Sequence, residues 1–399
     1  MRQAIRWASA LVLGAVGGAL AFAQPTNGVP QDTFKIAVVV PFSGVYGIHG
    51  QSIRRGMEIA MEERGGKVLG KPLELTWNDD DSKPQVGVQK ATQAIAGGAQ
   101  VIFGSVSSPV SLALMSVAAQ NKVPHIVTGS ADDRITGSDR SRYTFRTANP
   151  YNMEMRMTMG YIEAAGFKTL YAIGPDVGAA RDAWAGIQAD LKRAGVTVAG
   201  ESFLPLGTND FSVAVDKIMK SAPDGVISFF TGGDSVTFTR QATAVGLRNK
   251  SKLFGPTAYD ETTNAALGAS AIGLQSGVRY SKEVDNASNR RFVAAYNRKF
   301  KEDPPVYAGI AYNGFAWLLD TIDATKSWDR ERWIAAFETS KRPESVQGPE
   351  EMRACDHQAI HDGLWAEVVA NPANPSNPLM KLAKTFPAAR LYGPCGGVK

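Results

Sequence analysis

Histidine and cysteine are scarce in this chain of 399 residues, which contains four histidines and two cysteines. His357 and His361 are four residues apart and could ligate a metal from one helical face, but no H-E-x-x-H pattern surrounds them. The G-x-S-x-G motif of a nucleophile elbow is also missing. Because no nucleophile–base pair or metal site emerges, we expect no enzymatic activity, no metal and no cofactor.

Blocks of a single charge are missing as well. The net charge is +5, and Lys and Arg are spread along the chain without a polybasic run or a nucleic-acid-binding motif. We therefore expect no nucleic-acid partner. Beyond the first two dozen residues, no segment is long and apolar enough to cross a membrane.

The longest apolar run of the chain lies at the N-terminus. Arg2 and Arg6 precede the apolar residues 8–20, and an A-x-A pattern ends at Ala23. This pattern predicts a secretory signal peptide that is cleaved after Ala23, the alternative being an uncleaved membrane anchor. In an exported chain, a pair of cysteines favours a Cys355–Cys395 disulfide over two unpaired thiols.

Apolar, β-branched runs alternate with helical patterns along the rest of the chain. The residues at 35–40 form a continuous run ended by Pro41, which is typical of a strand buried on both faces of a parallel sheet. The alternation continues to about 127, restarts at about 152 and continues to about 254. It predicts an α/β fold with two series of βαβ units, and the length favours two lobes. The last predicted strand is 363–370, and the Asn-Pro-rich segment after it is expected to form surface turns.

Polar and small residues gather in the loops that follow the predicted strands, where α/β sheets bind their ligands. Ser107 and Ser108 follow the strand at 101–103, and Ser130 follows the strand at 125–127. Ser108 stands before Pro109 at a predicted helix N-terminus, where hydroxyl and amide donors favour a carboxylate. The alternative is that Ser108 only caps its own helix.

The chain resembles the type I periplasmic binding proteins, specifically the leucine/isoleucine/valine-binding branch. The resemblance spans about residues 33–370 and rests on the number and order of matching stretches, which include "KIAVVVPFSGVYGIHG", "VIFGSVSS", "VPHIVTGSA", "YTFRTANP" and "MRACDHQ". It implies a periplasmic location and an ABC permease as partner, and we expect a monomer. It also implies two Rossmann-like lobes joined by a three-crossing hinge. Lobe 1 is expected at 33–148 plus 278–348, and lobe 2 at 149–277 plus 349–392. The remaining segments are the signal peptide at 1–23, a linker at 24–32 and a tail at 393–399.

The resemblance also assigns ligand contacts. Ser108 matches the family serine that binds the ligand carboxylate, and Ser130 and Ala131 match the loop that completes this grip. The family usually has a hydroxyl at Ala131, so part of the grip could move to Ser130 or Ser107. Tyr46 and His49 match a loop that offers an aromatic wall, the alternative being ordinary loop residues.

Two departures from the family pattern concern the ligand. Thr257 stands where amino-acid binders carry an acidic residue, and a neutral hydroxyl cannot offset a desolvated ammonium. Ala179 replaces an expected tyrosine, so the wall would come from elsewhere, with Tyr151, Tyr259 and Tyr307 as candidates. Both departures favour a small carboxylate without an α-amino group, such as an aromatic acid. The alternatives are a branched-chain or hydrophobic amino-acid or amide binder that uses Asp260 or Asp234, and a ligand-sensing receptor module.

Overall fold

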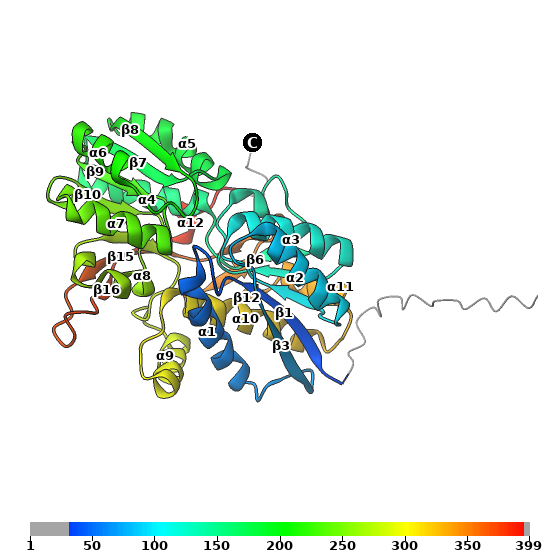
Figure 1. The fold of residues 1–399 in the computed structure, drawn as a ribbon. Helices are drawn as coiled ribbons and strands as arrows, with labels where there is room; N and C mark the ends of the chain where they lie inside the picture. Colours follow the sequence, from blue (N-terminus) through cyan, green and yellow to red (C-terminus); the bar gives the residue numbers. More distant parts are fainter. Residues whose placement is uncertain (1–31, 395–399) are drawn as a thin grey trace, which may run out of the picture.

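The computed structural model describes residues 32–394. The predicted signal peptide and Cys395, the predicted partner of Cys355, lie outside the described residues. Two sheets, each flanked by helices, form two lobes that lie side by side (Figure 1). This arrangement confirms the predicted α/β fold with two lobes.

The first lobe contains a six-stranded sheet in the order β2-β3-β1-β4-β5-β6, parallel except for the β2–β3 hairpin. Its strands are β1 (Phe34–Val40), β2 (Lys67–Val68), β3 (Lys71–Asp79), β4 (Val101–Phe103), β5 (His125–Val127) and β6 (Thr144–Arg146). Its helices are α1 (Gly50–Glu62), α2 (Pro84–Ala96), α3 (Ser108–Asn121), α9 (Ala287–Phe300), α10 (Val306–Thr325) and α11 (Arg330–Glu338). The buried side of α10 packs against α1, so a late segment completes the first lobe.

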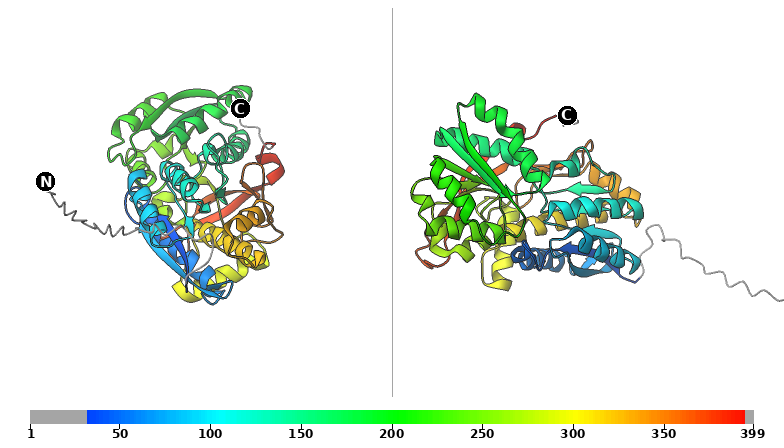
Figure 2. Two further views of the ribbon diagram at one scale, coloured as in Figure 1. Left: turned by 90° about the vertical axis from the view of Figure 1, so that its right-hand side faces the viewer. Right: turned by 45° about the horizontal axis from the view of Figure 1, so that its top comes forward.

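The second lobe contains a seven-stranded sheet in the order β16-β15-β11-β10-β9-β7-β8. Its strands are β7 (Thr169–Pro175), β8 (Thr197–Leu204), β9 (Gly225–Ser228), β10 (Lys252–Gly255), β11 (Gln275–Val278), β15 (Gly363–Val369) and β16 (Leu379–Phe386). Its helices are α4 (Tyr151–Ala165), α5 (Gly178–Arg193), α6 (Ser212–Ser221), α7 (Gly233–Ala244), α8 (Glu261–Leu267) and α12 (Ala388–Leu391). Figure 2 shows from two further directions that the last strands of the chain lie with this lobe.

The chain passes between the lobes after β6 and after β11, and it reaches β15 through a small sheet of β12 (Lys341–Arg342), β13 (Glu350–Met352) and β14 (Ala359–Ile360). Short 3-10 helices complete the described chain: η1 (Gly47–His49), η2 (Asp133–Thr136), η3 (Leu247–Asn249) and η4 (Gly268–Ala271). The buried parallel strands point their carboxyl ends towards the boundary between the lobes, which is where a ligand site is expected.

β16 is the longest of the strands that the sequence did not predict. It pairs antiparallel with β15 at the edge of the second sheet, and half of its residues are exposed. Lys381 and Lys384 interrupt the apolar residues, a pattern that protects an edge strand but hides it from a search for apolar runs. Only the Asn-Pro-rich segment before it, at 371–378, is the turn that the sequence predicted.

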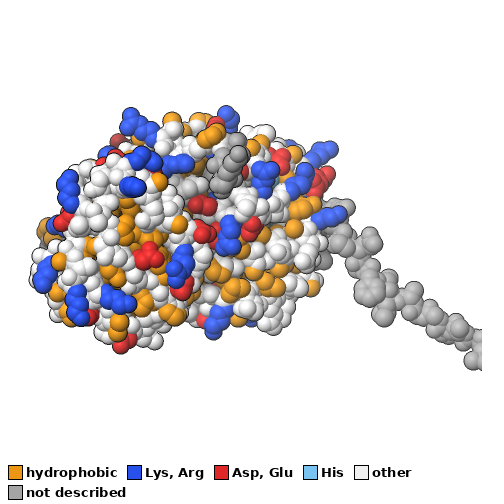
Figure 3. Space-filling view, turned by 90° about the horizontal axis from the view of Figure 1, so that it is seen from above, with side chains coloured by type: hydrophobic (Ala, Val, Ile, Leu, Met, Phe, Trp, Pro, Cys, Tyr) orange, Lys and Arg blue, Asp and Glu red, His pale blue; other side chains and the backbone are white. Residues whose placement is uncertain are grey.

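The surface agrees with the even charge distribution of the sequence. On the face shown in Figure 3, Lys and Arg side chains lie among Asp and Glu side chains rather than in one patch. Within residues 32–394, no helix combines the length and apolar character that a membrane span needs.

A candidate ligand-binding cavity between the lobes

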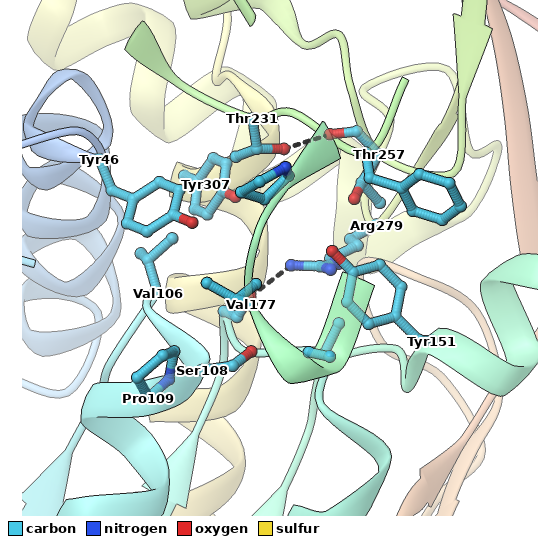
Figure 4. A pocket seen from close by; sticks show the side chains of 15 residues that line it. Tyr46, Val106, Ser108, Pro109, Tyr151, Val177, Thr231, Thr257, Arg279 and Tyr307 are labelled. Carbon is cyan, nitrogen blue, oxygen red and sulfur yellow. Dashed lines mark hydrogen bonds between the residues drawn. The ribbon is translucent and has the colours of Figure 1, made fainter. Parts of the chain in front are cut away.

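A cavity lies between the two lobes and has walls from both. Arg279, the first residue after β11, reaches it from the crossing between the lobes, and Figure 4 shows it at the centre of the labelled side chains. The first lobe contributes Tyr46, Val106, Ser108, Pro109, Gly129, Ala131 and Tyr307, and the second contributes Tyr151, Pro175, Val177, Ala179, Phe229, Thr231 and Thr257.

Ser108 begins α3 at the cavity wall. The N-cap is Ser107, one residue earlier than the sequence analysis expected, and its side chain makes no capping hydrogen bond. Ser108 Oγ instead accepts a hydrogen bond from the Asp132 backbone N–H at 3.3 Å. The hydroxyl hydrogen of Ser108 is therefore left to donate, and the first turn of α3 places the positive end of the helix dipole beside it.

Ser130 and Ser107 are buried and do not line the cavity. Ser130 Oγ donates to the backbone oxygen of Ser105 at 2.9 Å and lies 2.7 Å from Ser111 Oγ, so it holds two strand-end loops together. Ala131 does line the cavity. The loop after β5 thus presents the backbone of Ala131 to the cavity, whereas the Ser130 hydroxyl bonds to other residues of the protein.

Three of the four predicted tyrosines line the cavity, namely Tyr46, Tyr151 and Tyr307. Figure 4 shows Tyr46 and Tyr151 approaching from opposite sides, with their hydroxyl groups towards the space between them. Tyr259 is buried outside the lining, and its hydroxyl lies 3.3 Å from Thr239 Oγ1. The sequence alone does not distinguish these tyrosines, because each follows a strand or begins a helix.

His49 and Asp260 lie behind the wall rather than in it. The His49 ring stacks on Tyr307 with 3.9 Å between ring centroids. Its Nδ1 lies 3.7 Å from Asp260 Oδ2, and burial lowers the pKa of His49 despite this carboxylate. Asp260 caps α8 by accepting a hydrogen bond from the Thr263 N–H at 2.8 Å. The carboxylate of Asp260 is thus already used in the structure.

Arg279 is the charged lining residue that the sequence analysis missed. Its side chain is 5% exposed, its Nε donates to Glu154 Oε1 at 2.8 Å, and its Nη1 donates to the Gly129 oxygen. Burial would lower the pKa of Arg279, but the charge of Glu154 raises it overall, so the guanidinium is cationic. The sequence did contain one signal for Arg279. This residue comes directly after a buried strand, at the predicted crossing between the lobes near residue 278.

The charge of the cavity follows from this lining. Among the described residues that line it, Arg279 is the one charged side chain, and there is no Asp or Glu. Thr257 lies in the lining, and its backbone oxygen accepts a hydrogen bond from Thr231 Oγ1 at 2.6 Å. The walls therefore present a cation, hydroxyl groups and apolar surface. No cluster of His, Cys, Asp or Glu suited to a metal ion occurs in residues 32–394.

Known proteins share both the sequence pattern and the fold. A family model described as periplasmic binding protein matches residues 33–373. A Leu/Ile/Val-binding protein homolog 6 from Brucella melitensis biotype 1 is 26% identical over 313 residues, which cover 76% of this chain and 79% of that protein.

Two similar solved structures carry aromatic acids. A solute-binding protein of an ABC transporter from Rhodopseudomonas palustris BisB5, in complex with 3,4-dihydroxybenzoic acid, is 25% identical with a TM-score of 0.83, over 90% of this chain and 98% of that chain. A second, from R. palustris in complex with benzoate, is 25% identical with a TM-score of 0.81, over 89% and 97% of the two chains.

Proposed function

The chain belongs to the periplasmic binding protein family, and from this premise we propose that it captures a small organic carboxylate without an α-amino group. The ligand we favour is an aromatic acid. The family and the structural neighbours are solute-binding proteins of ABC transporters rather than enzymes. The lobes would close over the ligand and present the closed form to the permease.

The charge of the cavity is the observation that carries this proposal. Arg279 is a cation in the lining and no acidic side chain accompanies it there. A carboxylate would gain a charged hydrogen-bonding partner, whereas an α-ammonium would lose its water and face a like charge. A zwitterionic amino acid would thus bind more weakly than the same acid without its amino group.

The first-lobe wall supports a carboxylate at one end of the cavity. The Ser108 hydroxyl is free to donate, and Ser108 stands in the first turn of α3. Ala131 adds backbone from the neighbouring loop. Hydroxyl and amide donors at a helix N-terminus match the negative charge of a carboxylate.

The remaining walls suit a flat, mostly apolar body. Tyr46, Tyr151, Tyr307 and Phe229 supply aromatic rings, and Val106 and Val177 supply apolar surface. Aromatic rings favour stacked or edge-on contacts with another ring. Two structural relatives whose ligands are benzoate and 3,4-dihydroxybenzoic acid support this choice.

The alternative is a branched-chain or hydrophobic amino acid, which the names of the Brucella relatives favour. Its ammonium would need Asp260 or Asp234. Asp260 caps α8 behind the Tyr307 wall, and Asp234 accepts the Gly207 N–H at 3.0 Å outside the lining. Both carboxylates are therefore committed to the fold.

Matched ligand pairs test the proposal. Binding of 3-phenylpropionate would be compared with phenylalanine, and 4-methylpentanoate with leucine, by calorimetry on protein refolded free of bound ligand. Each pair differs by one ammonium, so the acid should bind at least tenfold more tightly. Tighter binding of phenylalanine or leucine would contradict the proposal and support the amino-acid alternative.

We also propose that the exported chain is cleaved after Ala23 and acts as a monomer with the domain boundaries given above. Intact-mass analysis of protein from the periplasm tests the cleavage site. The same sample under non-reducing and reducing conditions tests the Cys355–Cys395 disulfide, because its reduction should add the mass of two hydrogen atoms. Light scattering with and without ligand tests the monomer.

A further inference from the structure

Arg279 connects both lobes beside the cavity. Its Nε donates to Glu154 on α4 of the second lobe, and its Nη1 donates to the Gly129 oxygen in the first lobe. Its own backbone oxygen accepts from Gln347 Nε2. No hydrogen bond within residues 32–394 uses Nη2, and the residue lines the cavity, so its side chain can contact a ligand.

Glu154, the partner of Arg279, is fully buried and lies behind the lining. Oε1 accepts from Arg279, but Oε2 is buried without a hydrogen-bond partner among the described residues. Arg279, Arg146 on β6 and Asp133 on η2 are the charged groups that act on it, and Tyr151 and Tyr307 are the titratable neighbours on the cavity side. Burial raises the pKa of Glu154 to about 7, although Arg279 and Arg146 oppose this rise.

The pair is close to neutral before the ligand arrives, because one carboxylate faces one guanidinium. A ligand carboxylate at Arg279 brings a second negative charge to the same cation. Two carboxylates that share one site cannot both remain ionised without a large cost. The adjustment with the lowest free-energy cost is to protonate Glu154, whose Oε2 has no hydrogen-bond partner among the described residues.

We propose that Arg279 binds the ligand's carboxylate and that Glu154 takes up one proton when this carboxylate enters the cavity. The proposal rests on the proposed function, since it requires an anionic ligand. The proton comes from solvent buffer and is added to Oε2, and no bond to the ligand is made or broken. Capture of the acid is thereby coupled to proton uptake.

The expected pH dependence follows from linkage. Ligand binding raises the pKa of Glu154, so affinity increases as pH falls from about 9 towards 7, by up to tenfold per pH unit for one coupled proton. Below about pH 6 the free protein is already protonated at Glu154, and the affinity levels off. The ligand carboxyl has an ordinary pKa near 4 and stays ionised in this range. Burial lowers the pKa of His49, so its ring is neutral there.

Calorimetry in two buffers of different ionisation enthalpy measures the protons directly. With benzoate and 3-phenylpropionate as probes at pH 7.5–8, the wild type should take up between one half and one proton per ligand. Glu154→Gln should take up none and lose the pH dependence of its dissociation constant. Glu163→Gln changes an exposed carboxylate on the same helix and should keep the wild-type proton uptake.

The outcomes separate the two proposals. Binding of the acids with no proton uptake, or an undiminished uptake in Glu154→Gln, would overturn the inference and leave the proposed function standing. Failure of every acid in the panel to bind would overturn the proposed function itself. If Glu154→Gln does not fold, the proton uptake and pH profile of the wild type alone decide, because a flat profile between pH 7 and 9 contradicts the inference.

Discussion

Two buried arginines stand at crossings between the lobes, Arg146 at the end of β6 and Arg279 directly after β11. Arg146 has a partner for each nitrogen: Nε donates to Gln358 Oε1, Nη1 to the Asp132 oxygen and Nη2 to Thr136 Oγ1, each at 2.6 Å. Arg279 has protein partners for Nε and Nη1 and lines the cavity. A partner for every side-chain nitrogen marks a structural arginine, whereas a nitrogen left without one at a cavity marks an arginine that can bind a ligand.

The largest effect is expected when the structural arginine is removed. Arg146→Met would remove three buried hydrogen bonds, to Gln358 Oε1, Thr136 Oγ1 and the Asp132 oxygen. We expect a cost of about 3–5 kcal/mol in the free energy of unfolding. Chemical denaturation measures this loss. Below about pH 6, where Glu154 is already protonated, ligand affinity per folded molecule should stay within about threefold, since Arg146 does not line the cavity.

Arg142 on the same segment provides the control. It is exposed and pairs with Glu331, so Arg142→Met should change the free energy of unfolding by less than about 1 kcal/mol. Equal destabilisation by the two substitutions would show that burial and complete hydrogen bonding do not distinguish these arginines.

Removal of the cavity arginine should instead reduce ligand affinity more than the stability of the fold. Arg279→Met should weaken benzoate binding by about 30-fold or more, because truncating one partner of a buried charged contact costs about 2–5 kcal/mol. The fold should suffer less than in Arg146→Met, since Glu154 can bind a proton and leave no unpaired charge. Arg279→Lys should bind with intermediate affinity, because it keeps the charge but loses the planar fork. Calorimetry and denaturation of the same samples separate the two effects, and wild-type affinity in Arg279→Met would contradict the assignment.

The sequence could predict the fold but not this difference between the arginines. The buried runs, such as Phe34–Val40, and the helical patterns between them are local signals, and they led to two α/β lobes. In the sequence, however, Arg146 and Arg279 look alike, since each follows apolar residues of a strand. Only three-dimensional packing shows that Gln358 and Thr136 satisfy one of them.

The same limit applies to the loop serines. The sequence placed Ser107, Ser108 and Ser130 near strand ends, but the direction of each hydroxyl depends on distant contacts. Ser130 turns inward because the loop at 105–106 offers it carbonyl acceptors. Ser108 faces the cavity. Resemblance to a family pointed to loops that border the cavity, but only the structure shows which of their hydroxyl groups face it.

A smaller effect is expected for the serine hydroxyl in the wall. Ser108→Ala should weaken carboxylate binding about 5- to 30-fold, in line with about 1–2 kcal/mol for a lost hydrogen bond to a charged group. Ser107→Ala is the neighbouring control, because Ser107 Oγ is buried, lies outside the lining and has no hydrogen-bond partner among the described residues. It should change affinity less than threefold. A larger loss in Ser107→Ala than in Ser108→Ala would place the carboxylate grip one residue earlier.

The smallest effect repeats the arginine comparison with two tyrosines. Tyr307 lines the cavity and stacks on His49, while the buried Tyr259 lies outside the lining with its hydroxyl 3.3 Å from Thr239 Oγ1. Tyr307→Phe keeps the ring and removes a hydroxyl from the wall, so benzoate affinity should fall about two- to fivefold with little change in unfolding. Tyr259→Phe should leave affinity unchanged and lower the free energy of unfolding by about 1 kcal/mol, because Thr239 loses a buried partner. If Tyr259→Phe impaired binding and Tyr307→Phe did not, the ligand would contact Tyr259 rather than Tyr307, and Asp260, the next residue, would return as a ligand contact.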